Sequence, residues 1–258
     1  MSGETARPAP AWFVQLFAHR RWIRRTEPFP HIYAREVFTT AFYEHLRAEA
    51  VRVRAGTTDD ISLWALRDGP LALFTSREWH DLLAGLTELP VTGDITGHLR
   101  HHPVNSPGQQ PRTGLRRTVF PAHGEPGDTL DEAAGHQVGA VRNIPGDAAE
   151  RSGAAAIAAT AQGRVTIRTS ALLFHLGPEQ WRRGDGGETA LYPVAGDRTP
   201  ALVPPLGNSL VLFECTPYTR HRYLGGNSSA RDSVLMYLHR PDETGRPHDT
   251  EGDEHGRR

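Results

Sequence analysis

The sequence contains no lysine and 29 arginines. Schiff-base catalysis needs a lysine, and so does the phosphate-binding P-loop, whose GK[ST] lysine contacts the nucleotide phosphates. Both chemistries are therefore excluded. Any anionic ligand must be held by arginine side chains or by backbone N–H groups. A coding bias toward arginine, alanine, glycine and proline would explain the composition without a functional cause.

Cysteine, net charge and long apolar runs are also scarce. The single cysteine, Cys215, allows no disulfide within the chain and gives no sign of an oxidising compartment. The formal net charge of −1 creates no strong field that would attract nucleic acid or an acidic membrane surface. No apolar run reaches the roughly 18 residues of a membrane-spanning helix. We therefore expect a cytoplasmic protein with neither a nucleic-acid nor a membrane partner.

The first part of the chain, residues 11 to about 90, has the apolar spacing of helices. The chain has 258 residues, 38% of them hydrophobic, which is enough for the core of one domain. The stretch 37–53 places its apolar residues on one helical face. The stretch 75–89 begins with Thr75 three residues before Glu78, a capping-box pattern. Two helices are predicted here.

The later part of the chain, from residue 164 to about 240, has the pattern of short strands separated by Gly, Pro or Asn. Residues 121–163 are rich in glycine, alanine and charge, so we predict a mobile insertion. The polar residues 241–258 are predicted to be a disordered tail. Helices followed by a run of strands indicate an α+β protein, with one domain over residues 1–240 and an antiparallel sandwich or barrel as its second half.

A longer pattern covers residues 184–240, "GDGGETALYPVAGDRTPALVPPLGNSLVLFECTPYTRHRYLGGNSSARDSVLMYLHR". It resembles the C-terminal half of the prolyl-4-hydroxylase-like branch of the 2-oxoglutarate/Fe(II) oxygenases. That family has a Gly-Gly-Glu strand, a Pro-x-x-Gly-x-x-x-x-Phe strand, a metal-binding histidine and, about ten residues later, a basic residue that holds 2-oxoglutarate. The stretch "PFPHIYAREVFTTAFYEHL" also resembles the strand-then-helix opening of these proteins.

The resemblance implies a double-stranded β-helix, or jelly roll, buttressed by N-terminal helices. It implies that His221 is an Fe(II) ligand and that Arg231 binds the distal carboxylate of 2-oxoglutarate. In a chain without lysine, only arginine can fill the second role. The implied activity is that of a hydroxylase-type dioxygenase, which uses Fe(II), 2-oxoglutarate and oxygen to oxidise a small molecule or a carrier-bound amino acid.

The resemblance breaks down at the other two metal ligands. The family supplies them as His-x-Asp or His-x-Glu on an earlier strand, where the two-residue period puts both side chains on one face. Here Arg112, Thr113 and Gly114 stand at the expected place. Of the fourteen histidines, only His123 has a carboxylate two residues later, that of Glu125. Two interpretations stay open.

In the first interpretation, His123, Glu125 and His221 form the metal site. In the second, the protein is a metal-free, degenerate member of the fold that binds a ligand or catalyses a non-oxidative step. A pure interaction module is a third class, which requires side chains to fill the pocket. The expected partner is a small-molecule substrate. An apolar N-terminal cluster that contains Trp12 and Phe17 would pack on the barrel or on a second subunit, so a homodimer is a further expectation.

Overall fold

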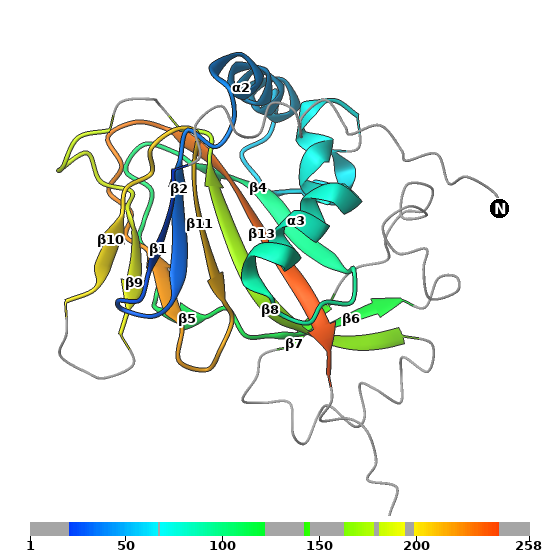
Figure 1. Ribbon diagram of the computed structural model, residues 1–258. Coiled ribbons are helices and arrows are strands. Elements are labelled where there is room, and N and C mark those ends of the chain that lie inside the picture. The colour runs from blue at the N-terminus through cyan, green and yellow to red at the C-terminus, as the bar shows by residue number, and fades with distance from the viewer. Residues whose placement is uncertain are drawn as a thin grey trace, which may run out of the picture.

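The computed structural model describes residues 21–66, 68–121, 142–144, 163–177, 181–193 and 199–242. The described residues form two antiparallel sheets and a helical layer (Figure 1). His123 and Glu125, most of the predicted insertion and the tail after residue 242 lie outside this part of the chain. None of the described helices has the length and apolar character of a membrane span.

The major sheet runs in the order β1-β2-β11-β8-β13-β4-β3, and β6 and β7 extend it from one end of β8. Its pairs are antiparallel. The strands are β1 (Arg21–Arg25), β2 (His31–Arg35), β3 (Ile61–Ser62), β4 (Ile95–His102), β6 (Arg117–Pro121), β7 (Arg142–Ile144), β8 (Gly163–His175), β11 (Ser209–Glu214) and β13 (Arg231–Pro241).

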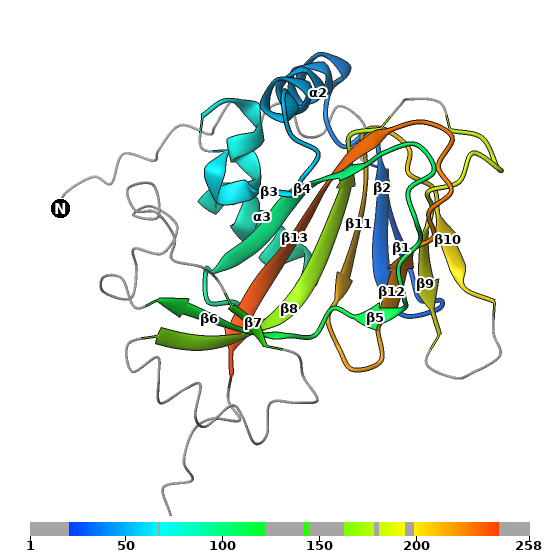
Figure 2. The ribbon, with the colours of Figure 1, turned by 180° about the vertical axis from the view of Figure 1, so that it is seen from behind.

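The minor sheet runs in the order β10-β9-β12-β5 and is also antiparallel. Its strands are β10 (Ala201–Val203), β9 (Thr189–Tyr192), β12 (Arg220–Tyr223) and β5 (Arg112–Thr113). This sheet faces one side of the major sheet, and the helices lie on the other side (Figures 1 and 2). An apolar cluster packs between the two sheets; it includes Tyr33, Ala171, Leu191, Val203, Val211 and Phe213.

The helical layer consists of α2 (Thr40–Arg54), the 3-10 helices η1 (Leu63–Ala65) and η2 (Pro70–Thr75), and α3 (Arg77–Thr87). It covers the outer face of the major sheet, where a larger apolar core forms. Because successive strand residues point to opposite faces, alternate residues of the same strands supply both cores. The outer core includes Phe38, Leu46, Trp79, Leu83, Phe174, Leu212 and Met236.

The predicted jelly-roll architecture and both main helices are confirmed, with local corrections. Residues 21–35 are two strands rather than helix, because β2 is inserted between β1 and β11 in the major sheet. The strand-then-helix opening implied by the resemblance is therefore correct. The cap of α3 is Ser76, whose hydroxyl accepts the Trp79 N–H. Thr75 instead donates to the Ala72 carbonyl.

Candidate functional site

A narrow pocket lies between the two sheets, at the end of β8 that contains His175. Its free volume, taken for the centre of a water molecule, is about 30 Å³. No carboxylate is among the described side chains that line it. The polar ones are Arg100, His102, Gln109, His175, Thr189, His221, Tyr223, Arg231 and Ser233, and the apolar ones include Leu173, Phe213 and Leu235.

Side chains on the inner face of β4 and β13 form one wall of the pocket. Arg231 pairs with His102, and Ser233 pairs with Arg100. Directly paired residues of antiparallel strands project to the same face, so all four side chains point toward the minor sheet. Ser233 also pairs with His175 of β8, which extends the polar wall onto a third strand.

Arg231 is buried without a full set of hydrogen bonds. Its side chain is 5% exposed, and its Nε and Nη1 have no hydrogen-bond partner among the described residues. Burial lowers the pKa of this guanidinium, while the charges of Glu188 and Asp185 raise it. An arginine keeps its proton in proteins, so Arg231 places buried positive charge in the pocket, with N–H groups free to bind a ligand.

Gly187 provides the space for this guanidinium. A Cβ at Gly187 would lie 2.6 Å from Cζ of Arg231, and the backbone φ of +78° is one that favours glycine. The Gly-Gly-Glu stretch of the sequence therefore has a steric role: its second glycine lets the backbone of the minor-sheet side approach Arg231.

His221 projects into the same pocket from the minor sheet. It pairs with Leu191 on one side and Arg112 on the other, and its ring centroid lies 5.1 Å from that of Phe213. Burial, followed by the charges of Arg112, Arg100 and Arg168, lowers the pKa of His221 to about 4. The imidazole is therefore neutral at physiological pH. Its buried Nδ1 has no partner among the described residues.

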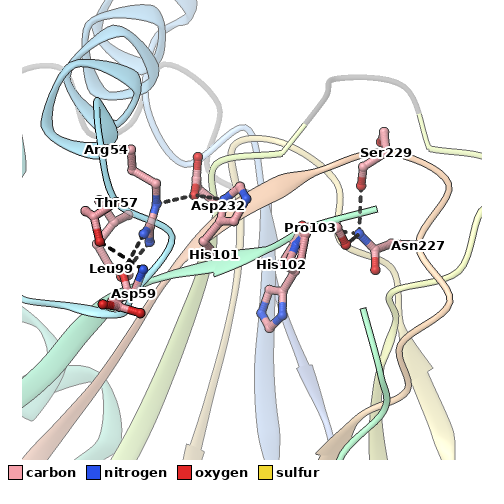
Figure 3. Close-up of polar contacts among 10 residues, drawn as sticks. All are labelled: Arg54, Thr57, Asp59, Leu99, His101, His102, Pro103, Asn227, Ser229 and Asp232. Carbon is pink, nitrogen blue, oxygen red and sulfur yellow. Dashed lines mark hydrogen bonds and ion pairs between the residues drawn. The ribbon is translucent and has the colours of Figure 1, made fainter. Parts of the chain in front are cut away.

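His221 and Arg231 lie on strands of different sheets. β12 belongs to the minor sheet and β13 to the major sheet, so the two residues approach the pocket from opposite walls. The connection between them is organised by the fully buried Asn227. Its amide donates to the carbonyls of Pro103 and Ser229, at 2.7 and 2.8 Å (Figure 3).

The structure adds two histidines, His102 and His175, to the predicted site. The His102 ring stacks on Tyr223 at 4.0 Å between centroids. Burial and then the charge of Arg231 lower the pKa of His175 to about 3. The spacing His98-x-Arg100-x-His102 carries a two-residue period that would place these side chains on one strand face. His175 has no comparable signal, because its neighbours come from distant segments.

The opposite face of the same strands holds a separate ion network. His101 Nδ1 and Arg54 Nε lie 3.0 and 2.6 Å from Oδ1 of Asp232. Arg54 also donates to the carbonyls of Asp59 and Leu99. In Figure 3 the His101 ring lies beside Asp232, whereas the His102 ring points away from that carboxylate. This network joins α2 to the strands behind the pocket.

The residues around His221 do not fit an iron centre of the family type. Arg112 stands beside His221, and arginine is not a metal ligand. A Cβ at Gly114 would lie 2.6 Å from Sγ of Cys215 and 3.7 Å from the ring of Tyr237, so the space for an acidic side chain is filled. Burial raises the pKa of the Cys215 thiol to about 12, which leaves it neutral. No group of three His, Cys, Asp or Glu side chains in the described residues could hold a metal.

His123 and Glu125, the alternative ligands, lie outside the described residues and stay predictions. The last described residue before them is Pro121, which pairs with Gly163 at the start of β8. The pocket residues Leu173 and His175 are at the other end of that strand.

Comparison with known proteins agrees with the architecture. No protein-family model and no curated protein matches the sequence. Among solved structures, the chain is similar to a prolyl 4-hydroxylase from Phytophthora capsici, with 19% identity and a TM-score of 0.50 over 81% of this chain. It is also similar to a prolyl hydroxylase from Trichoplax adhaerens, solved with a hypoxia inducible factor peptide. There the identity is 11% and the TM-score 0.51, over 81% of this chain and 82% of that one.

The chain spans only 58% of the length of the Phytophthora protein. These similarities confirm the predicted jelly-roll fold, which the chain shares with these two prolyl hydroxylases.

Proposed function

We propose that this protein binds a small carboxylate ligand in the pocket at Arg231 and does so without a metal ion. The observation that carries the proposal is the buried guanidinium of Arg231, which has two nitrogen atoms without partners among the described residues. Leaving a buried donor unsatisfied costs about 1–3 kcal/mol, and more for a charged group. A carboxylate accepts charge-assisted N–H bonds from a guanidinium, so it would satisfy one of these donors and neutralise the charge.

The metal-free form of the proposal rests on Arg112 and Gly114. The fixed positive charge of Arg112 beside His221 repels a divalent cation, and Gly114 has no room for a carboxylate arm. Of the predicted metal ligands, His221 is the one that the described part of the chain contains, and it lines the pocket. In this proposal the protein has the arginine that binds the cosubstrate carboxylate in this fold. Among the described residues, it lacks the other two ligands that an iron ion would need.

Iron-dependent oxidation with 2-oxoglutarate is the second candidate, favoured by the common pocket of His221 and Arg231. It requires His123 and Glu125 to complete the metal site. Both residues lie outside the part of the chain that the structure describes, so a metal-binding measurement decides between the two candidates.

Binding measurements in the presence and absence of metal distinguish the two candidates. We expect the protein to bind 2-oxoglutarate in EDTA and to retain no stoichiometric iron after anaerobic reconstitution. Arg231→Ala should weaken this binding by about 10- to 150-fold, since a hydrogen bond to a charged group contributes about 1.5–3 kcal/mol. The control is Arg220→Ala, whose side chain is exposed on the other face of β12; it should bind like wild type at 0.15 M salt.

The iron-dependent candidate makes the opposite prediction. It predicts that the wild-type protein binds one iron per chain and that His123→Ala loses both this iron and 2-oxoglutarate turnover. That result would overturn the metal-free proposal. Equal affinities of wild type and Arg231→Ala would remove Arg231 from the site under either candidate.

A further inference from the structure

We infer that the pocket has a second anion subsite, formed by Arg100 and Arg112 beside His221, and that its ligand is therefore a short dicarboxylate. The inference rests on the proposed function, in which Arg231 holds the first carboxylate. It assigns the second carboxylate to the position where a metal ion would otherwise supply positive charge.

Two strands from different sheets bring the two guanidinium groups to this position. Arg112 of β5 pairs with His221, so both side chains lie on the pocket face of the minor sheet. Its Nη2 donates to Oε1 of Gln109 at 3.2 Å, and Gln109 lines the pocket. Arg100 lines the pocket from β4. Arg112 is exposed, and its charge acts on His221 from beside the pocket.

A third guanidinium adds positive charge behind this position. Arg168 is 8% exposed, and its Cζ lies 3.7 Å from the ring centroid of Tyr237. Burial and then the charges of Arg116 and Arg112 lower the pKa of Arg168. Arginines of β4, β5 and β8 thus concentrate positive charge around the neutral imidazole of His221.

One carboxylate compensates part of this charge. Asp60 Oδ2 lies 3.3 Å from Nε of Arg100, with the Asp60 side chain 45% exposed. An exposed pair of this kind contributes little, so it competes weakly with a ligand. The buried Nδ1 of His221 has no partner among the described residues, and it can donate to the same ligand carboxylate in its Nδ1–H tautomer.

The spacing of the two subsites sets the length of the ligand. Tyr223 stacks on His102, and His102 pairs with Arg231, so Tyr223 marks the level of the first subsite. His221 is two residues away on β12, a step of about 7 Å. The carboxylates of an acid of about five carbons fit this step. The small free volume of the pocket excludes a bulky ligand.

Glutarate and pentanoate test the inference, because they share a five-carbon chain and differ by one carboxylate. Calorimetric titrations in EDTA should show glutarate binding at least 10-fold tighter than pentanoate. Arg112→Gln should weaken glutarate about 10-fold and leave pentanoate unchanged. Arg220→Gln removes the same charge from an exposed position of β12 and should affect neither acid by more than about 2-fold.

The outcomes separate this inference from the proposed function. Equal affinities for the two acids, or an equal loss of both in Arg112→Gln, would overturn the second subsite and leave Arg231 as a carboxylate anchor. Binding of neither acid or 2-oxoglutarate to the wild-type protein would overturn the proposed function and the inference together.

Discussion

Arg112 lies directly opposite His221 in the pairing of β5 with β12. The two side chains therefore leave the minor sheet on the same face, where a first-row metal ion would need a second neutral or anionic ligand. A guanidinium does not release its proton in proteins, so no change of tautomer or pH converts Arg112 into such a ligand. This residue pair therefore favours an anionic ligand over a cation in this part of the pocket.

The space at Gly187 controls the position of Arg231. We predict that Gly187→Ala weakens carboxylate binding at least 10-fold, because the new Cβ would lie 2.6 Å from Cζ of Arg231. Gly226→Ala is the matched control: its φ is also positive, +64°, but a Cβ there meets nothing within 4 Å. Each variant should lose roughly 1–2 kcal/mol of stability to backbone strain. Calorimetry should show a binding defect in Gly187→Ala alone, and equal defects in both would contradict the steric role.

The contact between Gly114 and Cys215 explains why an acidic residue is missing there. Gly114→Ala should destabilise the protein by about 1–3 kcal/mol through overpacking against Sγ. Cys215→Ala removes that sulfur, so the double variant should be more stable than the two single effects predict, by about 1–2 kcal/mol. Urea unfolding of the four proteins measures this coupling. Strict additivity would show that Cys215 does not occupy the space.

The ion pair between Arg54 and Asp232 should stabilise the fold. Arg54 is 7% exposed in its side chain, and Asp232 is 18% exposed. Arg54→Ala removes the buried guanidinium from this carboxylate and from two carbonyls and leaves His101 as the other described contact of Asp232, so we expect a loss of about 2–3 kcal/mol. Arg47→Ala breaks an exposed pair with Glu44 on the same helix and should leave the urea midpoint within error. Similar losses in both variants would mean that helix propensity, rather than the buried pair, dominates.

Buried neutral histidines should make the protein sensitive to acid. Burial lowers the pKa of His102 and His221 to about 4 and that of His175 and His239 to about 3. In the unfolded chain these groups titrate near 6.5. Between the two values the unfolded state binds more protons, so stability falls as the pH drops from about 6.5 toward 4.

The contribution of one histidine can be isolated at His239, which lies away from the pocket. Its Nε2 and Nδ1 lie 2.8 and 3.0 Å from the hydroxyls of Thr96 and Thr166. His239→Asn should reduce the slope of unfolding free energy against pH by up to ~1.4 kcal/mol per pH unit between pH 4 and 6. An unchanged slope would show that this histidine is protonated in the folded protein.

Local patterns predicted the elements, and distant pairings decided the site. The helix at Thr40–Arg54 follows from its apolar spacing, and the positions of His221 and Arg231 follow from the order of residues around them. Apolar spacing alone placed β2 in a helical stretch, because β2 is defined by its pairing with β11, far along the chain; the family resemblance indicated a strand there. His175 was missed for the same reason: it pairs with Ser233 and Ser209, contacts that no local period encodes.

The use of arginine alone for the pocket's cations has a consequence for its response to pH. A buried lysine can lose its proton near neutrality, so a lysine-based site would weaken in alkali. The guanidinium groups of Arg100, Arg112 and Arg231 retain their charge, and the neutral imidazoles beside them can only gain protons. The electrostatic response of this pocket is therefore one-way: acidification adds positive charge, and no physiological pH removes it. Weaker binding in mild acid would then come from protonation of the ligand or from unfolding of the chain.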